Sequence, residues 1–336
     1  MQRILVVVLL GLLASGLLSC SRGGAQEVVV YTSVDQVFSE PIFRTFERET
    51  GIAVRAVFDT EETKSTGVLN RLIAEARSPR ADVFWSGDPV RPFVLINHGL
   101  VEAYISPSAT AIPPSFKAAD GTWTGFAARA RVLLVNKHRV PSQDTPRSIE
   151  DLANPRWKGQ AAMANPLFGT TTMHVAALFA TWGQARTERF LEQVKANNVR
   201  IASSNGEVKR LVIGGEAAFG LLDSDDATDA LNTGAAMEVV YPDQDTLGTL
   251  VMPTAVVLIR GGPHPQNGRK LIDYLLSPDV EVRMAGTAGH MPLRSAVPTP
   301  VHVRPLSALR VMAADYSRVT SEIERIQPWL RNWVGL

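Results

Sequence analysis

Buried strands alternate with amphipathic helices near the start of the chain, and this alternation restricts the possible folds more than any other feature of the sequence. Residues 28–31 (Val-Val-Val-Tyr), Ile52 to Phe58 and residues 81–85 are apolar runs of strand length, and segments with helical periodicity lie between them. Continuous apolar runs are typical of strands that are covered on both faces. The order strand, helix, strand, helix, strand predicts an open parallel α/β sheet that presents its ligand chemistry at the strand ends.

The rest of the chain continues in the same class. Strands are expected at 131–135, 217–222 and 250–259, and helices at 170–182, 187–196, 268–276, 279–285 and in an amphipathic tail from 307 to 333. A chain of 336 residues exceeds the size at which one core keeps growing, so two domains are expected. We predict two α/β lobes joined by hinge strands, with residues 27–127 and 256–336 in lobe 1 and residues 128–255 in lobe 2.

Composition and charge exclude several classes of protein. Hydrophobic residues make up 45% of the chain and charged residues 20%, which is a globular balance and not that of a disordered tail. The formal net charge is +1 and no basic run occurs, so nucleic acid is not an expected partner. A single cysteine excludes an intramolecular disulfide and a thiolate zinc site.

The amino terminus resembles a bacterial lipoprotein signal. Arg3 precedes an apolar run from Ile4 to Leu18, which is shorter than the roughly 20 residues that span a membrane. The run ends in Leu-Leu-Ser-Cys, which resembles the lipobox, and Cys20 is the only cysteine. The alternative is an incidental Cys20 inside an ordinary cleaved signal. We predict a signal peptide at 1–19, a tether at 20–26 and lipid anchoring through Cys20 at the periplasmic or cell-surface face of a bacterial membrane.

Motifs along nearly the whole chain resemble a known family. They lie at residues 31–36 and 46–54, 81–85, 129–132, 155–159, 215–218, 242–244 and 288–294. Together they resemble the bacterial extracellular solute-binding proteins, in particular the ferric-ion-binding branch. The resemblance implies a type II periplasmic-binding fold, a monomer that closes over its ligand, and partners in the permease and ATPase subunits of an ABC importer.

The sequence departs from the ferric-binding branch at its metal ligands. Asp225 and Asp226 stand where the resemblance places a tyrosine pair, and the histidine of that branch falls near Asp35. Carboxylate oxygens suit Fe(III) or another hard cation as a ligand, so Asp225 and Asp226 are candidate metal ligands. The specific support for iron is lost, and an anionic or zwitterionic solute such as an aminoalkylphosphonate fits as well.

An acidic cluster follows the predicted strand at 217–222. Three carboxylates occur within Asp-Ser-Asp-Asp at 223–226, and they repel one another unless a cation, an ammonium group or a basic side chain offsets them. The alternative is that they cap the helix that follows.

An anion site is expected where the helix at 170–182 begins. Gly169, Thr170 and Thr171 offer backbone N–H groups, hydroxyls and the positive end of the helix dipole. A hydroxyl-rich helix cap is the alternative. Arg129 or Arg131 on the hinge strand would add a positive fork, unless they form surface ion pairs.

Polar residues after the first three strands form the expected lip of a cleft, although loops of this kind are polar in any case. These candidate ligand-binding residues are Ser33, Val34, Asp35, Thr63, Lys64, Gly87 and Asp88. Asn205 and Tyr241 match positions that face the cleft in the family.

No catalytic motif occurs in the chain. The patterns G-x-S-x-G, H-E-x-x-H and G-x-x-x-x-G-K-[ST] are absent from the sequence. The Asp-x-Asp at 223–225 resembles that of haloacid-dehalogenase phosphatases, but Ala227 stands where that pattern has Thr or Val. We therefore expect a binding protein and not an enzyme, with a metal-dependent phosphohydrolase as a remote alternative. A sensing lipoprotein without a transport role is the other alternative.

Overall fold

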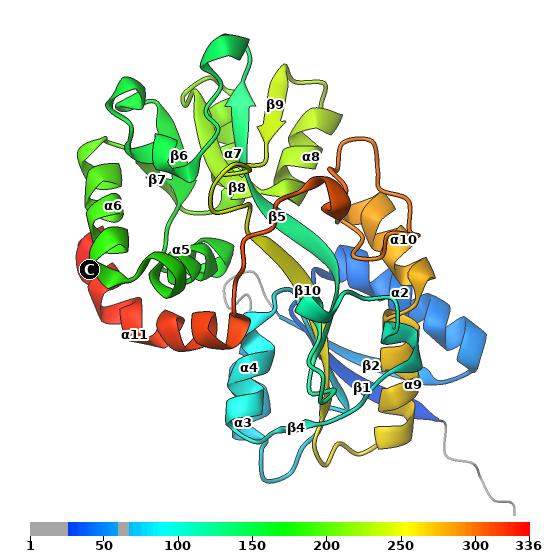
Figure 1. Ribbon diagram of the computed structural model, residues 1–336. Coiled ribbons are helices and arrows are strands. Elements are labelled where there is room, and N and C mark those ends of the chain that lie inside the picture. The colour runs from blue at the N-terminus through cyan, green and yellow to red at the C-terminus, as the bar shows by residue number, and fades with distance from the viewer. Residues whose placement is uncertain (1–25, 60–66) are drawn as a thin grey trace, which may run out of the picture.

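The computed structural model describes residues 26–59 and 67–336. Two α/β lobes share one run of hydrogen-bonded strands in the order β2-β1-β3-β10-β5-β8-β6-β7 (Figure 1). The predicted α/β class is confirmed. Cys20, Thr63 and Lys64 lie outside the described residues.

The first lobe contains the parallel strands that the sequence predicts. β1 (Glu27–Thr32) pairs in parallel with β2 (Ala53–Phe58) and β3 (Val83–Ser86). β10 (Val251–Ile259) pairs antiparallel with β3 and with the short β4 (Val101–Glu102). The helices of this lobe are α2 (Gln36–Thr50), α3 (Gly67–Ala74), α4 (Val90–Asn97), α9 (Pro265–Leu275) and α10 (Pro278–Ala288).

The second lobe is built around the far half of β5 (Thr124–Asn136). β8 (Phe219–Asp223) and β9 (Met237–Val240) pair antiparallel with β5, and β6 (Ala161–Ala164) joins β8 to β7 (Arg200–Ala202) in parallel. The helices are α5 (Gly169–Trp182), α6 (Gln184–Ala196), α7 (Asn205–Ile213) and α8 (Ser224–Asn232).

Two long buried strands connect the lobes. β5 pairs with β10 up to Ala130 and with β8 from Arg131 onward, so the strand crosses from one lobe to the other. A few residues before the crossing, opposite Ala127, the pairing register of β10 shifts between Pro253 and Thr254. Ala127 has a φ of 45°, a left-handed conformation that is costly for a side chain with a Cβ. The crossing strands are where we expect lobe movement, while the lobe boundaries given above stay a prediction.

The carboxyl-terminal helix begins later than expected. α11 (Tyr316–Val334) starts after Asp315, whose side chain accepts hydrogen bonds from the backbone N–H groups of Ser317 and Arg318. The prediction of a helix from residue 307 was therefore wrong for its first nine residues, since only a short 3-10 turn, Leu306–Ala308, forms there. α11 packs against α5 of the second lobe and α4 of the first (Figure 1).

The parallel strands give the first lobe two different edges. Their carboxyl ends point toward the second lobe, and their amino ends form the opposite edge, where the described chain begins (Figure 1). In an open α/β sheet the carboxyl edge is where ligands bind. None of the helices in the described ranges is long and apolar enough to cross a membrane.

Candidate ligand site between the lobes

A fully buried arginine organises the second-lobe half of the site. The guanidinium of Arg131 lies on β5, and its Nη1 is 2.6 Å from Oδ1 of Asp223. The same nitrogen donates to Thr170 Oγ1 at 3.1 Å and to Asn205 Oδ1 at 3.2 Å, while Nη2 donates to Thr171 Oγ1 at 3.2 Å. A buried charge requires such partners, so these polar residues are needed to satisfy Arg131 as well as to present a site.

Arg129 lies two residues earlier on β5, on the same face of the strand, and links the two lobes. Its Nη1 is 3.3 Å from Asp223 Oδ2 and 3.5 Å from Asp225 Oδ2, both in the second lobe. Its Nη2 donates to the carbonyl oxygen of Gly87, in the first lobe, at 2.8 Å. The predicted strand-end residues of both lobes therefore meet at one guanidinium.

The charge around Arg129 is strongly negative. Burial alone would lower the pKa of Arg129, but the carboxylates of Asp225 and Asp223, and then those of Asp35 and Asp88, outweigh burial and raise it. Three candidate residues from the sequence, Asp35, Asp88 and Asp225, thus act on the same cation. This is the arrangement expected of a cleft lip.

Asp225 is held in an unfavourable environment. Burial raises the pKa of Asp225 to about 7; Arg129 opposes this shift, and the neighbouring carboxylates of Asp223 and Asp226 add to it. Its Oδ1 is buried and has no hydrogen-bond partner among the described residues. A buried acceptor without a partner costs stability unless something else supplies the donor. A ligand with a hydrogen-bond donor could therefore stabilise the site by donating to this oxygen.

Asp226 faces a basic side chain. Burial raises the pKa of Asp226, with Asp223 adding to the shift and Lys209 opposing it. The Nζ of Lys209 lies 3.4 Å from Asp226 and 2.6 Å from Asp229. Asp225 and Asp226 do stand in the first turn of α8, as the capping alternative requires, but the N-cap residue Asp223 makes no capping bond and serves the arginines instead.

The described ranges contain no group of three or more His, Cys, Asp or Glu side chains placed to hold a metal ion. The carboxylates of Asp225 and Asp226 are shared with Arg129 and Lys209. Metal binding by Asp225 and Asp226 stays a prediction.

The start of α5 offers an open helix end beside the arginine cluster. The N-cap residue Phe168 makes no side-chain capping bond, and a Cβ placed on Gly169 would meet no other heavy atom within 4 Å. The hydroxyl of Thr170 donates to Asp223 Oδ2 at 2.9 Å, which ties the start of α5 to the start of α8. Exposed N–H groups and the helix dipole at this point suit an anion.

The remaining candidate residues in the first lobe also form hydrogen bonds that stabilise the ends of its strands. Ser33 Oγ accepts from the backbone N–H of Gly87 at 3.0 Å, and the N–H of Val34 donates to Thr32 Oγ1. At the start of α4, the side chain of Asp88 accepts a hydrogen bond from the backbone N–H of Val90 at 2.9 Å and forms an ion pair with Arg91. These bonds hold the ends of β1 and β3 together next to Arg129.

Tyr241 lies at the end of β9 and faces the 300–304 segment. Its hydroxyl accepts from the backbone N–H of Arg304 at 3.1 Å, and the guanidinium of Arg304 lies over its ring. The contacts described for Tyr241 thus join it to this segment and not to the arginine cluster.

Two contributors were not among the site residues that the sequence predicted. Asp223 accepts hydrogen bonds from both arginines, and His290 lies buried near Arg129, where burial and then Arg129 lower the pKa of its imidazole to about 3. His290 is thus neutral at physiological pH. The motif at 288–294 gave a signal for this segment, but not for the position of its histidine.

Comparison with known proteins decides the family. The profile of the bacterial extracellular solute-binding proteins matches residues 78–318. The chain belongs to this family. The resemblance predicted from the motifs is confirmed, and since members of the family are binding proteins, so is the prediction that the chain is not an enzyme.

The names of relatives of this solute-binding protein refer to different ligands. It is 27% identical over 290 residues to iron uptake protein A1 of Synechocystis, covering 82% of this chain and 78% of the relative. It is 26% identical over 337 residues to a putative 2-aminoethylphosphonate-binding periplasmic protein of Salmonella typhimurium, covering 96% and 92%.

Solved structures confirm the type II periplasmic-binding fold. A Bordetella ferric binding protein superposes with a TM-score of 0.77 at 26% identity, covering 92% of this chain and 99% of the other. The ferric binding protein from Campylobacter jejuni superposes with a TM-score of 0.81 at 20% identity, again covering 92% and 99%.

Proposed function

We propose that this protein is the lipid-anchored substrate-binding component of an ABC importer and that it captures a small organic solute with a cationic and an anionic group. The observation that carries the proposal is the position of Arg129, which contacts Gly87 of one lobe and Asp223 and Asp225 of the other. Arg129 contacts Asp225, whose Oδ1 has no hydrogen-bond partner among the described residues, and it shares the carboxylate of Asp223 with Thr170 at the open amino end of α5.

The site offers a hydrogen-bond acceptor for the cationic group of such a solute and hydrogen-bond donors for its anionic group. An ammonium group would donate to Asp225 Oδ1, and a phosphonate, phosphate or carboxylate would accept from the first N–H groups of α5. Thr170 joins these two places through its bond to Asp223. Both places lie in the second lobe, next to Arg129, which contacts Gly87 of the first lobe. Closure of the first-lobe loops over the bound solute would then give the closed state the greater affinity.

Ferric iron with a bound anion is the second candidate. The iron-related names of several relatives favour it, and carboxylate oxygens are suitable ligands for a hard cation. Against it stands the number of oxygen ligands that a metal ion needs, since it would have to displace Arg129 and Lys209 from Asp225 and Asp226, whereas an ammonium group needs only the Oδ1 of Asp225 that Arg129 does not contact.

The remaining parts of the proposal follow from the amino terminus and the family. Lipidation at Cys20 would hold the protein at the outer face of a membrane, where permease and ATPase subunits are the expected partners. A role in sensing without transport is distinguished by uptake, since deletion of the gene would abolish import only if the protein feeds a permease.

A thermal-shift panel on residues 26–336 tests the ligand class. The panel contains 2-aminoethylphosphonate, phosphate, amino acids, polyamines, Ca²⁺ and Fe(III)-citrate. A ligand at about 100 times its Kd stabilises the fold by about 2.7 kcal/mol, which is readily seen. We expect a shift with an organic zwitterion that is lost in Asp225→Asn and kept in Asp229→Asn. A shift with metal alone, reversed by a chelator, would contradict the proposal and support the second candidate.

A further inference from the structure

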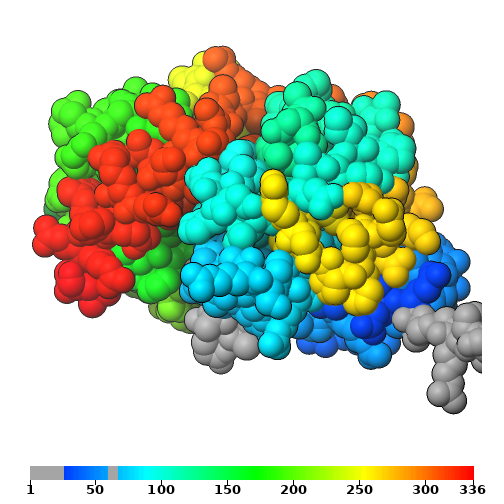
Figure 2. Space-filling model, turned by 90° about the horizontal axis from the view of Figure 1, so that it is seen from below, coloured from blue at the N-terminus to red at the C-terminus, as the bar shows by residue number. Residues whose placement is uncertain are grey.

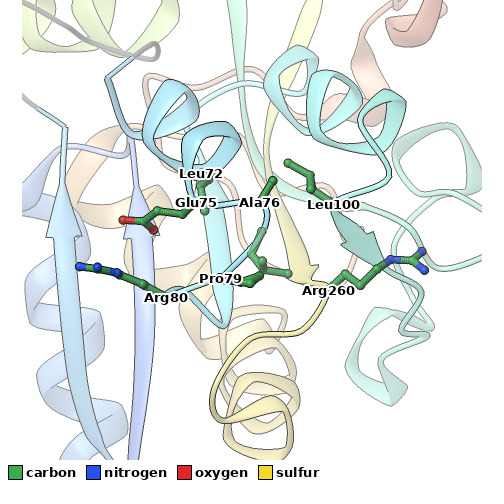
Figure 3. Close-up of a pocket in the computed structure, with 8 residues that line it drawn as sticks. Leu72, Glu75, Ala76, Pro79, Arg80, Leu100 and Arg260 are labelled. Carbon is green, nitrogen blue, oxygen red and sulfur yellow. The ribbon is translucent and has the colours of Figure 1, made fainter.

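The amino edge of the first lobe forms a continuous surface around the point where the described chain begins. It consists of the starts of β1 and β2, the 75–80 turn and the 260–264 turn, and we call it the entry face (Figures 1 and 2). Asn267 donates to the carbonyl oxygen of Glu27 at 2.8 Å, which fixes α9 to the start of β1. Pro79, Arg80 and Arg260 line one shallow pocket, which joins the two turns (Figure 3).

The entry face carries more positive than negative charge. Its acidic residues are already neutralised, because Glu27 pairs with Arg55 at 3.2 Å and Glu75 with Arg71 at 2.9 Å. Figure 3 shows the side chains of Arg80 and Arg260 extending to opposite sides of Pro79. Three exposed arginines of this face have no carboxylate within 4.0 Å in the described part of the chain, namely Arg77, Arg80 and Arg260.

The proposed anchor places this face close to the membrane. Between the lipid on Cys20 and the first strand there are seven residues, 20–26. An extended chain spans at most about 3.5 Å per residue, so the start of β1 lies within about 25 Å of the bilayer surface. The edge that is held next to the membrane is thus the edge whose three arginines form no ion pair in the described ranges, although Nη2 of Arg260 donates to the carbonyl oxygen of Val101 at 2.9 Å.

We propose that the entry face rests on the anionic lipid surface that holds the anchor, an inference that uses the lipid anchoring proposed above. Guanidinium groups form paired hydrogen bonds with phosphate oxygens. Each basic residue near an anionic bilayer strengthens binding about fivefold, so three give about a 100-fold preference over neutral lipid at low salt. The cleft, at the opposite edge of the lobe, then stays open to solvent for capture of the ligand.

Binding to vesicles tests the surface without the anchor. Residues 21–336 contain every helix and strand described above, and this soluble form is mixed with vesicles of phosphatidylcholine alone or of equimolar phosphatidylglycerol and phosphatidylcholine. We expect roughly 100-fold stronger partitioning onto the phosphatidylglycerol vesicles at low ionic strength, which weakens as salt is added. Equal partitioning onto both kinds of vesicle would overturn the proposal.

Charge-reversal variants separate this face from a general effect of net charge. Arg77→Glu/Arg80→Glu/Arg260→Glu should bring partitioning close to the level on phosphatidylcholine. The matched control changes the charge equally at exposed residues of the second lobe that form no ion pair in the described ranges, namely Lys137, Lys158 and Arg189. Equal losses in both triple variants would contradict the proposal.

A fluorophore reports the orientation directly. The soluble form lacks Cys20 and therefore has no cysteine, so a label on Ser78→Cys in the entry face is unique, and Asn232→Cys in the second lobe is its control. Nitroxide lipids should quench the label at 78 and not at 232, and the reverse pattern would overturn the proposal.

These results are independent of the ligand panel and of lipid attachment at Cys20. Failure of vesicle binding with a positive panel removes only the entry-face proposal. Vesicle binding with a negative panel removes only the proposed ligand.

Discussion

Replacing Asp225 by asparagine should stabilise the protein at neutral and alkaline pH. The carboxyl is only 24% exposed, and burial raises its pKa from 3.8 to about 7. Between these two values the folded protein keeps a proton that the unfolded chain has lost, so the free energy of unfolding falls as pH rises through this window. Above pH 7 the full penalty is present.

The size of the effect follows from the shift. A difference of about 3 pKa units corresponds to about 4 kcal/mol, and screening by solvent at this partly exposed side chain reduces this to about 2 kcal/mol. Asparagine keeps the shape of the side chain but has no charge to bury. Asp225→Asn should therefore gain about 2 kcal/mol at pH 8 and close to nothing at pH 4, and at the same time lose affinity for a ligand with an ammonium group.

Urea unfolding at several pH values measures this difference. The quantity to compare is the midpoint of Asp225→Asn minus that of the wild type, because other groups change the absolute curve. Asp229→Asn is the control, since Asp229 lies on the same helix but its side chain is 64% exposed. If Asp225→Asn is less stable than the wild type at pH 8, or if the difference does not change with pH, Asp225 is not held in the disfavoured state argued here.

Three further predictions rest on other parts of the structure. Arg131→Met leaves Asp223 without its main partner in a buried site, and we expect a loss of about 3–5 kcal/mol in urea unfolding. Gly248→Ala should cost about 1–3 kcal/mol in the same assay, because φ is +85° and a Cβ would lie 2.8 Å from the backbone of the 310–312 segment. His174 and His290 should keep the NMR signals of neutral imidazole at pH 5, since burial and a nearby arginine lower the pKa of each to about 3.

The local parts of the fold were predictable because they depend on periodicity and on helix-ending residues. The apolar runs at β1, β2 and β3 indicated parallel strands, and Gly51 ends α2 in the left-handed conformation that glycine adopts readily. The start of the carboxyl-terminal helix was harder to predict. An apolar pattern continues upstream of α11, but the bonds that Asp315 accepts from the next turn fix the start of the helix.

The centre of the site depends on a contact between distant parts of the chain. Arg131 and Asp223 stand directly opposite each other in the antiparallel register of β5 and β8, although 92 residues separate them in sequence. Periodicity identified both strands but gives no register. The sequence therefore indicated carboxylates at one strand end and arginines on another, and the structure is needed to show that they neutralise one another.

This neutralisation bears on how the protein would respond to its ligand. Arg129 bonds to Gly87 of one lobe and lies against Asp223 and Asp225 of the other, so separating the lobes must break one of the two sets of contacts. Even while those contacts are made, one oxygen of Asp225 has no hydrogen-bond partner in the part of the chain that the structure describes. A ligand that supplies the missing donor satisfies this atom from the second lobe, and if the first-lobe loop at Gly87 then covers the ligand, its binding energy is largest in the closed state. The same carboxylate that weakens the folded protein thus favours closure over a solute with a cationic group.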